Sequence, residues 1–101
     1  MNLVQILLPV HDNSGVAFPP ELYAKVHAEL TDRFGGLTAF MRAPAQGLWK
    51  EEDRTVHDDI VVLEIMTAEL DMVWWRDYRQ SLETSFRQDT IIIRAQKLQL
   101  L

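Results

Sequence analysis

The sequence predicts an α+β fold whose elements follow the order strand, helix, strand, strand, helix, strand. Two observations support this class. Apolar runs of strand length alternate with two segments that carry apolar residues at helical spacing. The chain has 101 residues, close to the commonest size of one domain, and its 48% hydrophobic and 25% charged residues are typical of a globular protein. We therefore expect a single domain over residues 1–101.

The first half of the chain contains a strand, a helix and a second strand. Branched apolar residues from Leu3 to Val10 predict a strand, because turn formers follow it at residues 12–15. Pro19-Pro20-Glu21 opens a helix, and Gly35-Gly36 ends it. The second strand runs from Leu37 to Arg42. Helical spacing places five residues on one face of the helix: Tyr23, Val26, His27, Leu30 and Phe34.

The second half contains two further strands around a second helix. Residues 48–59 are strongly charged and predict a long hairpin connection that leads into a strand at Ile60–Met66. A helix is expected from about Ala68 to Phe86, and a last strand from Thr90 to Leu101. The second helix carries a mostly aromatic stripe: Asp71, Trp74, Trp75, Tyr78, Leu82, Ser85 and Phe86.

This order is that of the ferredoxin-like fold, with a four-stranded antiparallel sheet and both helices on one face. The strands are apolar on both sides, since Leu3 and Leu7 oppose the other apolar residues of the first strand and Ile91-Ile92-Ile93 has no polar side. Two helices cannot cover two faces, and a wet apolar face is unfavourable. We therefore expect a homodimer through the sheet face. The alternative cover is a strand or the C-terminal tail folding back over this face, and the tail at Leu98–Leu101 is too short to cover it alone.

Composition excludes several classes of function. The net charge is -5 and the pI is about 5.0, so neither nucleic acid nor a membrane is an expected partner. There is no cysteine, which excludes disulfides, thiolate metal sites and a cysteine nucleophile. The start of the chain has no basic segment and its apolar run stops at Pro9, unlike a signal peptide. A cytoplasmic location is the resulting expectation.

Two segments resemble a small family of uncharacterised bacterial proteins. The first is Phe34-Gly35-Gly36-Leu37-Thr38, followed by Gly47-Leu48-Trp49 and Arg54. The second is Tyr78 with Phe86-Arg87-Gln88-Asp89 before the isoleucine-rich strand. Members of this family look like dimeric α+β barrels, in which two ferredoxin-like sheets close on each other. The superfamily includes cofactor-free monooxygenases, haem-degrading enzymes and lactone isomerases, so the resemblance implies a fold and leaves the activity open.

Three residues are candidates for proton transfer. His11 lies at the end of the first strand, where strand ends often line a pocket. Glu64 is the one charge inside an apolar strand, and a buried carboxyl group is suited to acid–base catalysis. Its alternative role is an ion pair with Arg94 or Arg42 across the sheet, or a place at the rim of the dimer interface. Tyr78, on the aromatic stripe, is the third candidate, although such a stripe usually packs in the core.

A binding role is assigned to residues in and beside the charged connection. Arg42 and Arg54 can hold an anion, with Trp49 stacking beside it. His57, followed by two aspartates, can serve as a metal ligand only with Asp59, because neighbouring strand residues point to opposite faces. No other ligand has metal-site spacing, so no metal and no cofactor is expected. Haem would require His57 or His11 as its axial ligand.

His27 is expected to be a packed or interfacial histidine, because it lies on the apolar side of the first helix. Two functions follow from the whole pattern. One is a dimeric domain that binds a small molecule or serves as a stable module. The alternative is a cofactor-free enzyme, monooxygenase- or isomerase-like, that acts on a small aromatic or anionic substrate.

Overall fold

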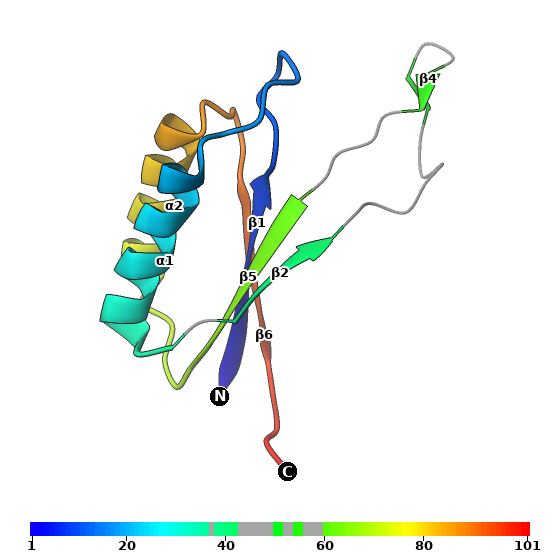
Figure 1. The fold of residues 1–101 in the computed structure, drawn as a ribbon. Coiled ribbons are helices and arrows are strands. Elements are labelled where there is room, and N and C mark those ends of the chain that lie inside the picture. The colour runs from blue at the N-terminus through cyan, green and yellow to red at the C-terminus, as the bar shows by residue number, and fades with distance from the viewer. Residues whose placement is uncertain (37, 43–49, 52–53, 56–59) are drawn as a thin grey trace.

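The computed structural model describes residues 1–36, 38–42, 50–51, 54–55 and 60–101, the three middle ranges by their backbone. Two helices lie side by side on one face of an antiparallel sheet (Figure 1), which confirms the predicted α+β class. The strand order is β2-β5-β1-β6. The strands of this sheet are β1 (Asn2–Pro9), β2 (Thr38–Arg42), β5 (Ile60–Thr67) and β6 (Ile92–Lys97). A separate pair, β3 (Lys50–Glu51) with β4 (Arg54–Thr55), lies in the predicted hairpin connection.

Helix α1 (Pro20–Phe34) begins and ends where the sequence signals place it. Proline occupies its first turn, where its missing N–H costs no helical hydrogen bond, and Glu21 lies at the positive end of the helix dipole. At the other end Gly35 adopts a left-handed conformation with φ of 78°. Its N–H donates to the Thr31 carbonyl at 2.8 Å, which satisfies one of the last carbonyl groups of the helix.

Helix α2 (Met72–Ser85) begins later than the expected start near Ala68. The reason is a cap that periodicity does not reveal: Asp71 Oδ1 accepts a hydrogen bond from the Trp74 N–H at 3.1 Å. The last strand is also shorter than expected. Its pairing with β1 covers Ile92–Lys97, because the preceding Ile91 N–H donates to a side chain of α2. At the other end, the Leu98 N–H still donates to the Met1 carbonyl opposite it.

The core lies between the sheet and the two helices. Alternate residues of β1 point into it, and Ile6 and Leu8 are completely buried. The aromatic stripe of α2 packs as predicted for core residues: Trp75 stacks on Phe34 at 5.3 Å between ring centroids, and Phe86 contacts Phe18 edge-on at 5.1 Å. Neither α1 nor α2 is long and apolar enough to cross a membrane, and no other helix occurs in the described ranges.

The opposite face of the sheet, here called the open face, is covered by neither α1 nor α2 (Figure 1). It carries the side chains that alternate with the core residues of β1, β5 and β6. Their exposure ranges from buried Val62 to Met66 and Ile92, which are 56% and 54% exposed. The apolar members of this face are Leu3, Leu7, Ile60, Val62, Met66 and Ile92. The homodimer expected through this face stays a prediction.

Candidate functional site

The loop after β1 is folded by one carboxylate. Asp12 Oδ1 accepts hydrogen bonds from the N–H groups of Ser14 at 2.8 Å and Val16 at 2.9 Å. Gly15 supplies the positive φ of 82° that this turn requires. The hydrogen bond from Val16 is the largest cause that holds the pKa of Asp12 below its ordinary 3.8. Desolvation opposes it, and the hydrogen bond from Ser14 and the charge of Arg87 lower the pKa further. The ionised Asp12 side chain therefore has a structural role in stabilising this loop.

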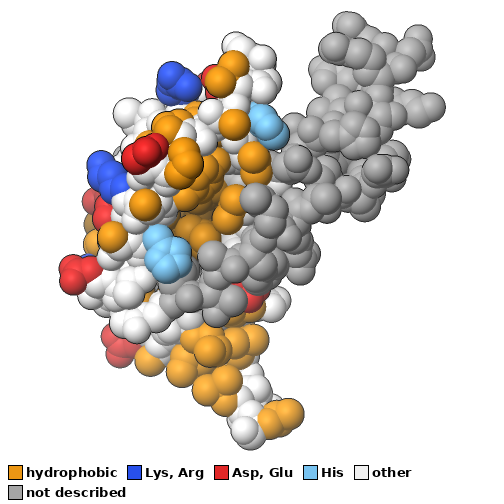
Figure 2. All heavy atoms as spheres, in the orientation of Figure 1, with side chains coloured by type: hydrophobic (Ala, Val, Ile, Leu, Met, Phe, Trp, Pro, Cys, Tyr) orange, Lys and Arg blue, Asp and Glu red, His pale blue; other side chains and the backbone are white. Residues whose placement is uncertain are grey.

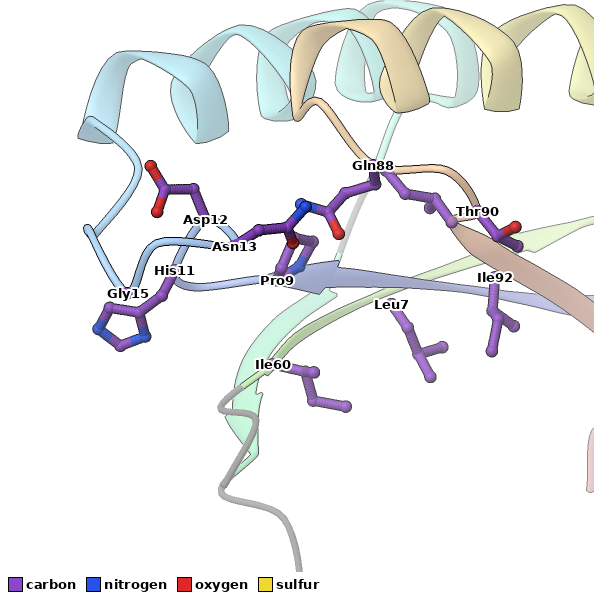
Figure 3. A pocket seen from close by; sticks show the side chains of 11 residues that line it. Leu7, Pro9, His11, Asp12, Asn13, Gly15, Ile60, Gln88, Thr90 and Ile92 are labelled. Atoms are coloured by element: carbon purple, nitrogen blue, oxygen red, sulfur yellow. The ribbon is translucent and has the colours of Figure 1, made fainter. Parts of the chain in front are cut away.

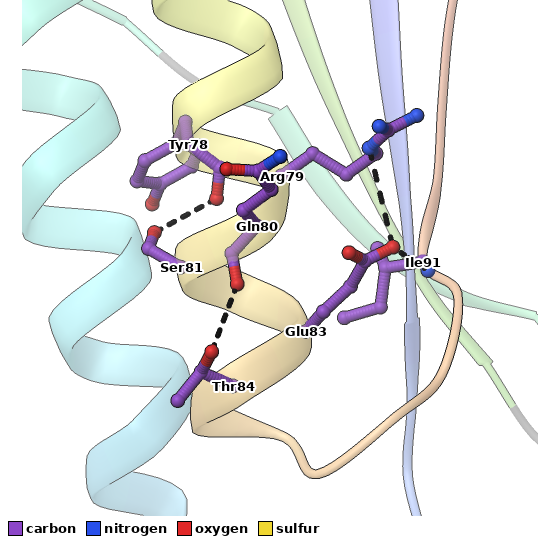
Figure 4. Close-up of polar contacts among 7 residues, drawn as sticks. All are labelled: Tyr78, Arg79, Gln80, Ser81, Glu83, Thr84 and Ile91. Carbon is purple, nitrogen blue, oxygen red and sulfur yellow. Dashed lines mark hydrogen bonds and ion pairs between the residues drawn. The ribbon is translucent and has the colours of Figure 1, made fainter.

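The segment that follows α2 lies beside this loop. Arg87 has a positive φ of 51°, which turns the chain sharply after the helix, and its guanidinium group lies 3.6 Å from Asp12 Oδ2. One residue on, the Gln88 N–H donates to the Glu83 carbonyl at 2.9 Å. The Glu83 carboxylate also accepts from the Ile91 N–H at 2.9 Å and pairs with Arg79 (Figure 4). These contacts fix the start of β6 against the end of α2.

Loop and segment together form a hollow of about 740 Å³ at the end of β1, here called the β1-end hollow. Figure 3 shows that Leu7, Ile60 and Ile92 point away from the helices, toward the open face. Polar side chains of the loop and of the segment after α2 form the other walls. Its lining residues are Leu7, Pro9, His11, Asp12, Asn13, Gly15, Ile60, Gln88, Thr90, Ile91 and Ile92. An apolar floor facing polar walls can hold a small molecule that has both apolar and hydrogen-bonding parts.

A second hollow of about 230 Å³ lies on the helix side of the sheet, and its lining is almost wholly apolar. The Tyr23 hydroxyl at its wall donates to the Pro9 carbonyl at 2.5 Å, and partial burial raises the pKa of this phenol. Figure 2 shows two histidine side chains at the surface with hydrophobic side chains between them. The lining residues are Val10, Ala17, Phe18, Tyr23, His27, Val61 and Leu63.

His27 differs from its expectation as a packed histidine. Its side chain is exposed and lies at the wall of the second hollow. The reason is its angular position on α1. Val26 and Leu30 are buried under the sheet, whereas a residue one position beyond Val26 is rotated about 100° around the helix axis, toward solvent.

The structure separates the three residues predicted to transfer protons. Of these, His11 alone lines a described hollow, where it is exposed and forms a bridge with Ala17. Tyr78 is buried in the core at 7% exposure, and its hydroxyl has no hydrogen-bond partner among the described residues. Burial, together with the negative charge of Glu29, raises the pKa of this hydroxyl, so Tyr78 remains protonated and is not available as a base.

Glu64 lies on the open face, on the side of the sheet opposite to Tyr78. Its Oε2 accepts from the Gln5 amide Nε2 at 2.6 Å, and the Gln5 Oε1 accepts from Arg94 Nε at 2.8 Å. The expected partner Arg94 is thus reached through a glutamine on the strand between them. This chain of hydrogen bonds, Glu64–Gln5–Arg94, is here called the polar ladder.

The predicted binding residues lie between residues 37 and 59, where the structure describes at most the backbone. Arg42 ends β2 and Arg54 begins β4, both known by their backbone, while Trp49 and His57 lie outside the described residues. Within the described ranges no three His, Asp or Glu side chains gather as a metal site would require. Sequence reasoning overlooked Asn13, Gln88 and Thr90, whose only signal is their position directly after a strand or a helix.

Comparisons with known proteins bear on the fold. No protein-family model matches the chain, and no curated protein is similar to it. A phage SAM lyase in complex with S-methyl-5′-thioadenosine superposes with a TM-score of 0.61 at 15% identity, covering 95% of this chain and 80% of that chain. The phage SAM lyase in its apo state gives a TM-score of 0.61 at 14% identity, covering 94% and 78%. At such low identity, what this chain shares with the phage SAM lyase is a small α+β fold.

Proposed function

We propose that this chain is a ferredoxin-like domain that acts as a homodimer of the α+β barrel type and binds a small organic molecule in the β1-end hollow. The carrying observation is that the hollow and the open face share a floor. Leu7, Ile60 and Ile92 belong to both. A second copy placed on the open face therefore closes the hollow from the side that is now open to solvent, and converts a surface depression into an enclosed site.

The lining defines the chemistry of the ligand. The floor is aliphatic, and Asn13, Gln88 and Thr90 supply neutral hydrogen-bonding groups. The carboxylate of Asp12 is used by backbone amides and by Arg87, so it is not available to neutralise a cation. The site therefore suits a neutral molecule with an apolar part and several hydroxyl or amide-like groups. The phage SAM lyase supports this class, because the small molecule named in its complex, S-methyl-5′-thioadenosine, has a thioether, a purine and a ribose.

The second candidate function is a cofactor-free enzyme that uses the same hollow. The observation favouring it is that His11 reaches the wall of the hollow. An imidazole nitrogen can accept a proton from a bound substrate. Glu64 and Tyr78 have no part in this version, since one is on the open face outside the hollow and the other is buried with a raised pKa.

The binding function is tested by calorimetric titration of the purified protein with S-methyl-5′-thioadenosine, S-adenosylmethionine, adenosine and benzoate. We expect the neutral thionucleoside or adenosine to bind more tightly than benzoate. Gln88→Ala weakens binding by about fivefold or more, because it removes a hydrogen bond inside the hollow. The matched control Gln80→Ala lies on the exposed side of α2 and leaves binding unchanged. Equal affinities of both variants and wild type, or no saturable binding, would contradict the proposal.

The two functions are separated by His11→Ala. A binding domain retains its affinity for the best ligand of the titration and shows no product by chromatography in either form. An enzyme converts one of the compounds that bind, and His11→Ala retains binding while turnover falls by about 100-fold or more.

A further inference from the structure

The open face carries charge in a fixed order across three neighbouring strands. Arg94 on β6, Gln5 on β1 and Glu64 on β5 stand opposite one another in the register, with Gln5 between the two charges. Its amide donates to Glu64 and accepts from Arg94, so the two charged side chains are held on either side of Gln5 on this face. Apolar side chains lie along the strands on both sides of the ladder, among them Leu3, Leu7 and Val62.

The polar ladder uses only part of the hydrogen-bonding capacity of its two ends. Within the described residues, Arg94 donates through Nε, which leaves the two terminal guanidinium nitrogens, and Glu64 accepts through Oε2, which leaves Oε1. A covering layer that buried these atoms without partners would lose several kcal/mol. A covering layer that places a carboxylate over Arg94 and a cation over Glu64 would satisfy both groups most strongly.

A second copy of the chain provides this arrangement in one orientation. Two sheets that pack face to face are related by a two-fold axis in the plane between them. An axis parallel to the strands and above β1 exchanges the sides of the sheet, so Arg94 of one protomer lies over Glu64 of the partner subunit. An axis perpendicular to the strands instead places Arg94 over the partner's Arg94. Packed sheets are about 10 Å apart, a gap that these long side chains can bridge from both sides.

We infer that the open face is a self-complementary interface whose two-fold axis runs along β1, with two reciprocal ion pairs between Arg94 and Glu64 of opposite protomers. This inference deepens the proposed homodimer: it names the residues that fix the orientation of the two copies. The apolar side chains of the open face supply the buried area, and the two ion pairs select one arrangement because the other brings like charges together.

The test uses two complementary charge reversals. The Glu64→Arg variant has an arginine at both ends of the polar ladder, and the Arg94→Glu variant has a glutamate at both ends. In a homodimer of either variant, the facing side chains therefore carry charge of the same sign. We expect the dimer dissociation constant of each to rise by about 100-fold or more, measured by analytical ultracentrifugation. When the two variants are mixed, every pair becomes complementary again, and we expect a one-to-one heterodimer with an affinity within about tenfold of the wild type. The matched controls Asp32→Arg and Arg76→Glu carry the same charge changes on exposed helix positions and leave the dimer unchanged.

Several outcomes would overturn the inference: a wild-type protein that sediments as a monomer or trimer, single variants that dimerise like the wild type, or a mixture that stays monomeric although both variants give a native circular dichroism spectrum. The sedimentation test needs no ligand, so it is independent of the titrations of the β1-end hollow. A protein that binds its ligand while monomeric would refute the dimer and retain the binding site. A dimer that binds none of the compounds would refute the binding site and retain the dimer.

Discussion

The two faces of the sheet have similar numbers of apolar side chains in β1 but differ in what lies over them. On the helix face, Val4, Ile6 and Leu8 are buried under two helices. On the open face, the intervening residues Leu3 and Leu7 are half-buried, and a polar ladder crosses between them. The apolar residues of the helix face are buried within a single chain. The open face combines apolar area with two charged groups that have unused hydrogen-bonding atoms among the described residues, a combination that suits an interface with a specific partner.

Two neighbouring residues of β1 give the most direct test of the difference between the two faces. Ile6→Ala removes a completely buried side chain from the helix face, and we expect the free energy of unfolding to fall by about 2–5 kcal/mol. Leu7→Ala, on the open face, costs about 1 kcal/mol or less in the separated protomer. Urea unfolding at two protein concentrations measures both changes.

The concentration series distinguishes the faces. The loss in Ile6→Ala should be the same at both concentrations. The loss in Leu7→Ala should grow at the higher concentration, because dimerisation stabilises the folded chain by mass action. A Leu7→Ala effect that is independent of concentration would indicate that the open face is not an interface.

The next largest effect concerns the contact between the helix layer and β6. Glu83→Ala leaves the N–H of buried Ile91 without its acceptor, and we expect a loss of about 1–3 kcal/mol in the free energy of unfolding. Glu83→Gln retains an acceptor oxygen at the same place and should recover most of that loss. Thermal unfolding of both variants measures the difference. Equal losses would show that the charge, including the pair with Arg79, matters more than the hydrogen bond to β6.

A smaller effect of opposite sign is expected inside the helix layer. Tyr78→Phe removes a buried hydroxyl that has no partner among the described residues, so the free energy of unfolding should rise by about 1 kcal/mol. The raised pKa also has a consequence at alkaline pH. In the unfolded chain the Tyr78 phenol ionises near its ordinary pKa of 10.0, whereas the folded chain keeps it protonated to higher pH. Ionisation therefore favours the unfolded chain, and the free energy of unfolding falls as the pH rises above 10.

Urea unfolding of wild type and Tyr78→Phe over the alkaline range checks both points. The wild type should lose more stability above pH 10 than the variant. Tyr23 keeps a raised pKa in both proteins and contributes equally to both curves. A variant less stable than the wild type at neutral pH would reveal a partner for the hydroxyl.

The smallest effect lies in the loop at the β1-end hollow. The pKa of Asp12 is lowered in the folded chain, so its contribution to stability is present above pH 3.8 and is lost as the pH falls below that value. Asp12→Asn should lower the melting temperature at neutral pH, and the gap to the wild type should narrow on acidification. Asp32→Asn, on α1, serves as the control. A gap that stays constant from neutral pH to below 3.8 would contradict this role.

Much of the element order could be predicted from the sequence, because each element carries a local signal. The glycine pair after Phe34 ends α1, and branched apolar runs mark β1 and β5. The start of α2 was missed since Asp71 resembles any acidic residue of a first turn until its carboxylate is seen to accept the Trp74 N–H. The end of the last strand was missed because strand pairing depends on a distant partner.

The candidate site was less predictable for the same reason. His11 was identified because it directly follows a strand. No sequence pattern marks Gln88 and Thr90 as site residues. They lie beside the loop after β1 only because the chain turns back toward the sheet after α2. Glu64 is conspicuous in the sequence, yet the residue that connects it to Arg94 is Gln5, about sixty positions earlier on another strand.

Gln5 has one more consequence, which concerns how β1 finds its place during folding. A shift of β1 by a single residue would turn every side chain to the opposite side, so Gln5 would enter the core while Ile6 and Leu8 would meet water. The misaligned strand would also leave Glu64 and Arg94 without their shared amide. Gln5→Leu would remove this discrimination, and slower refolding or doubled amide signals in that variant would reveal it. One neutral side chain in the middle of β1 thus favours the native register over a register shifted by one residue.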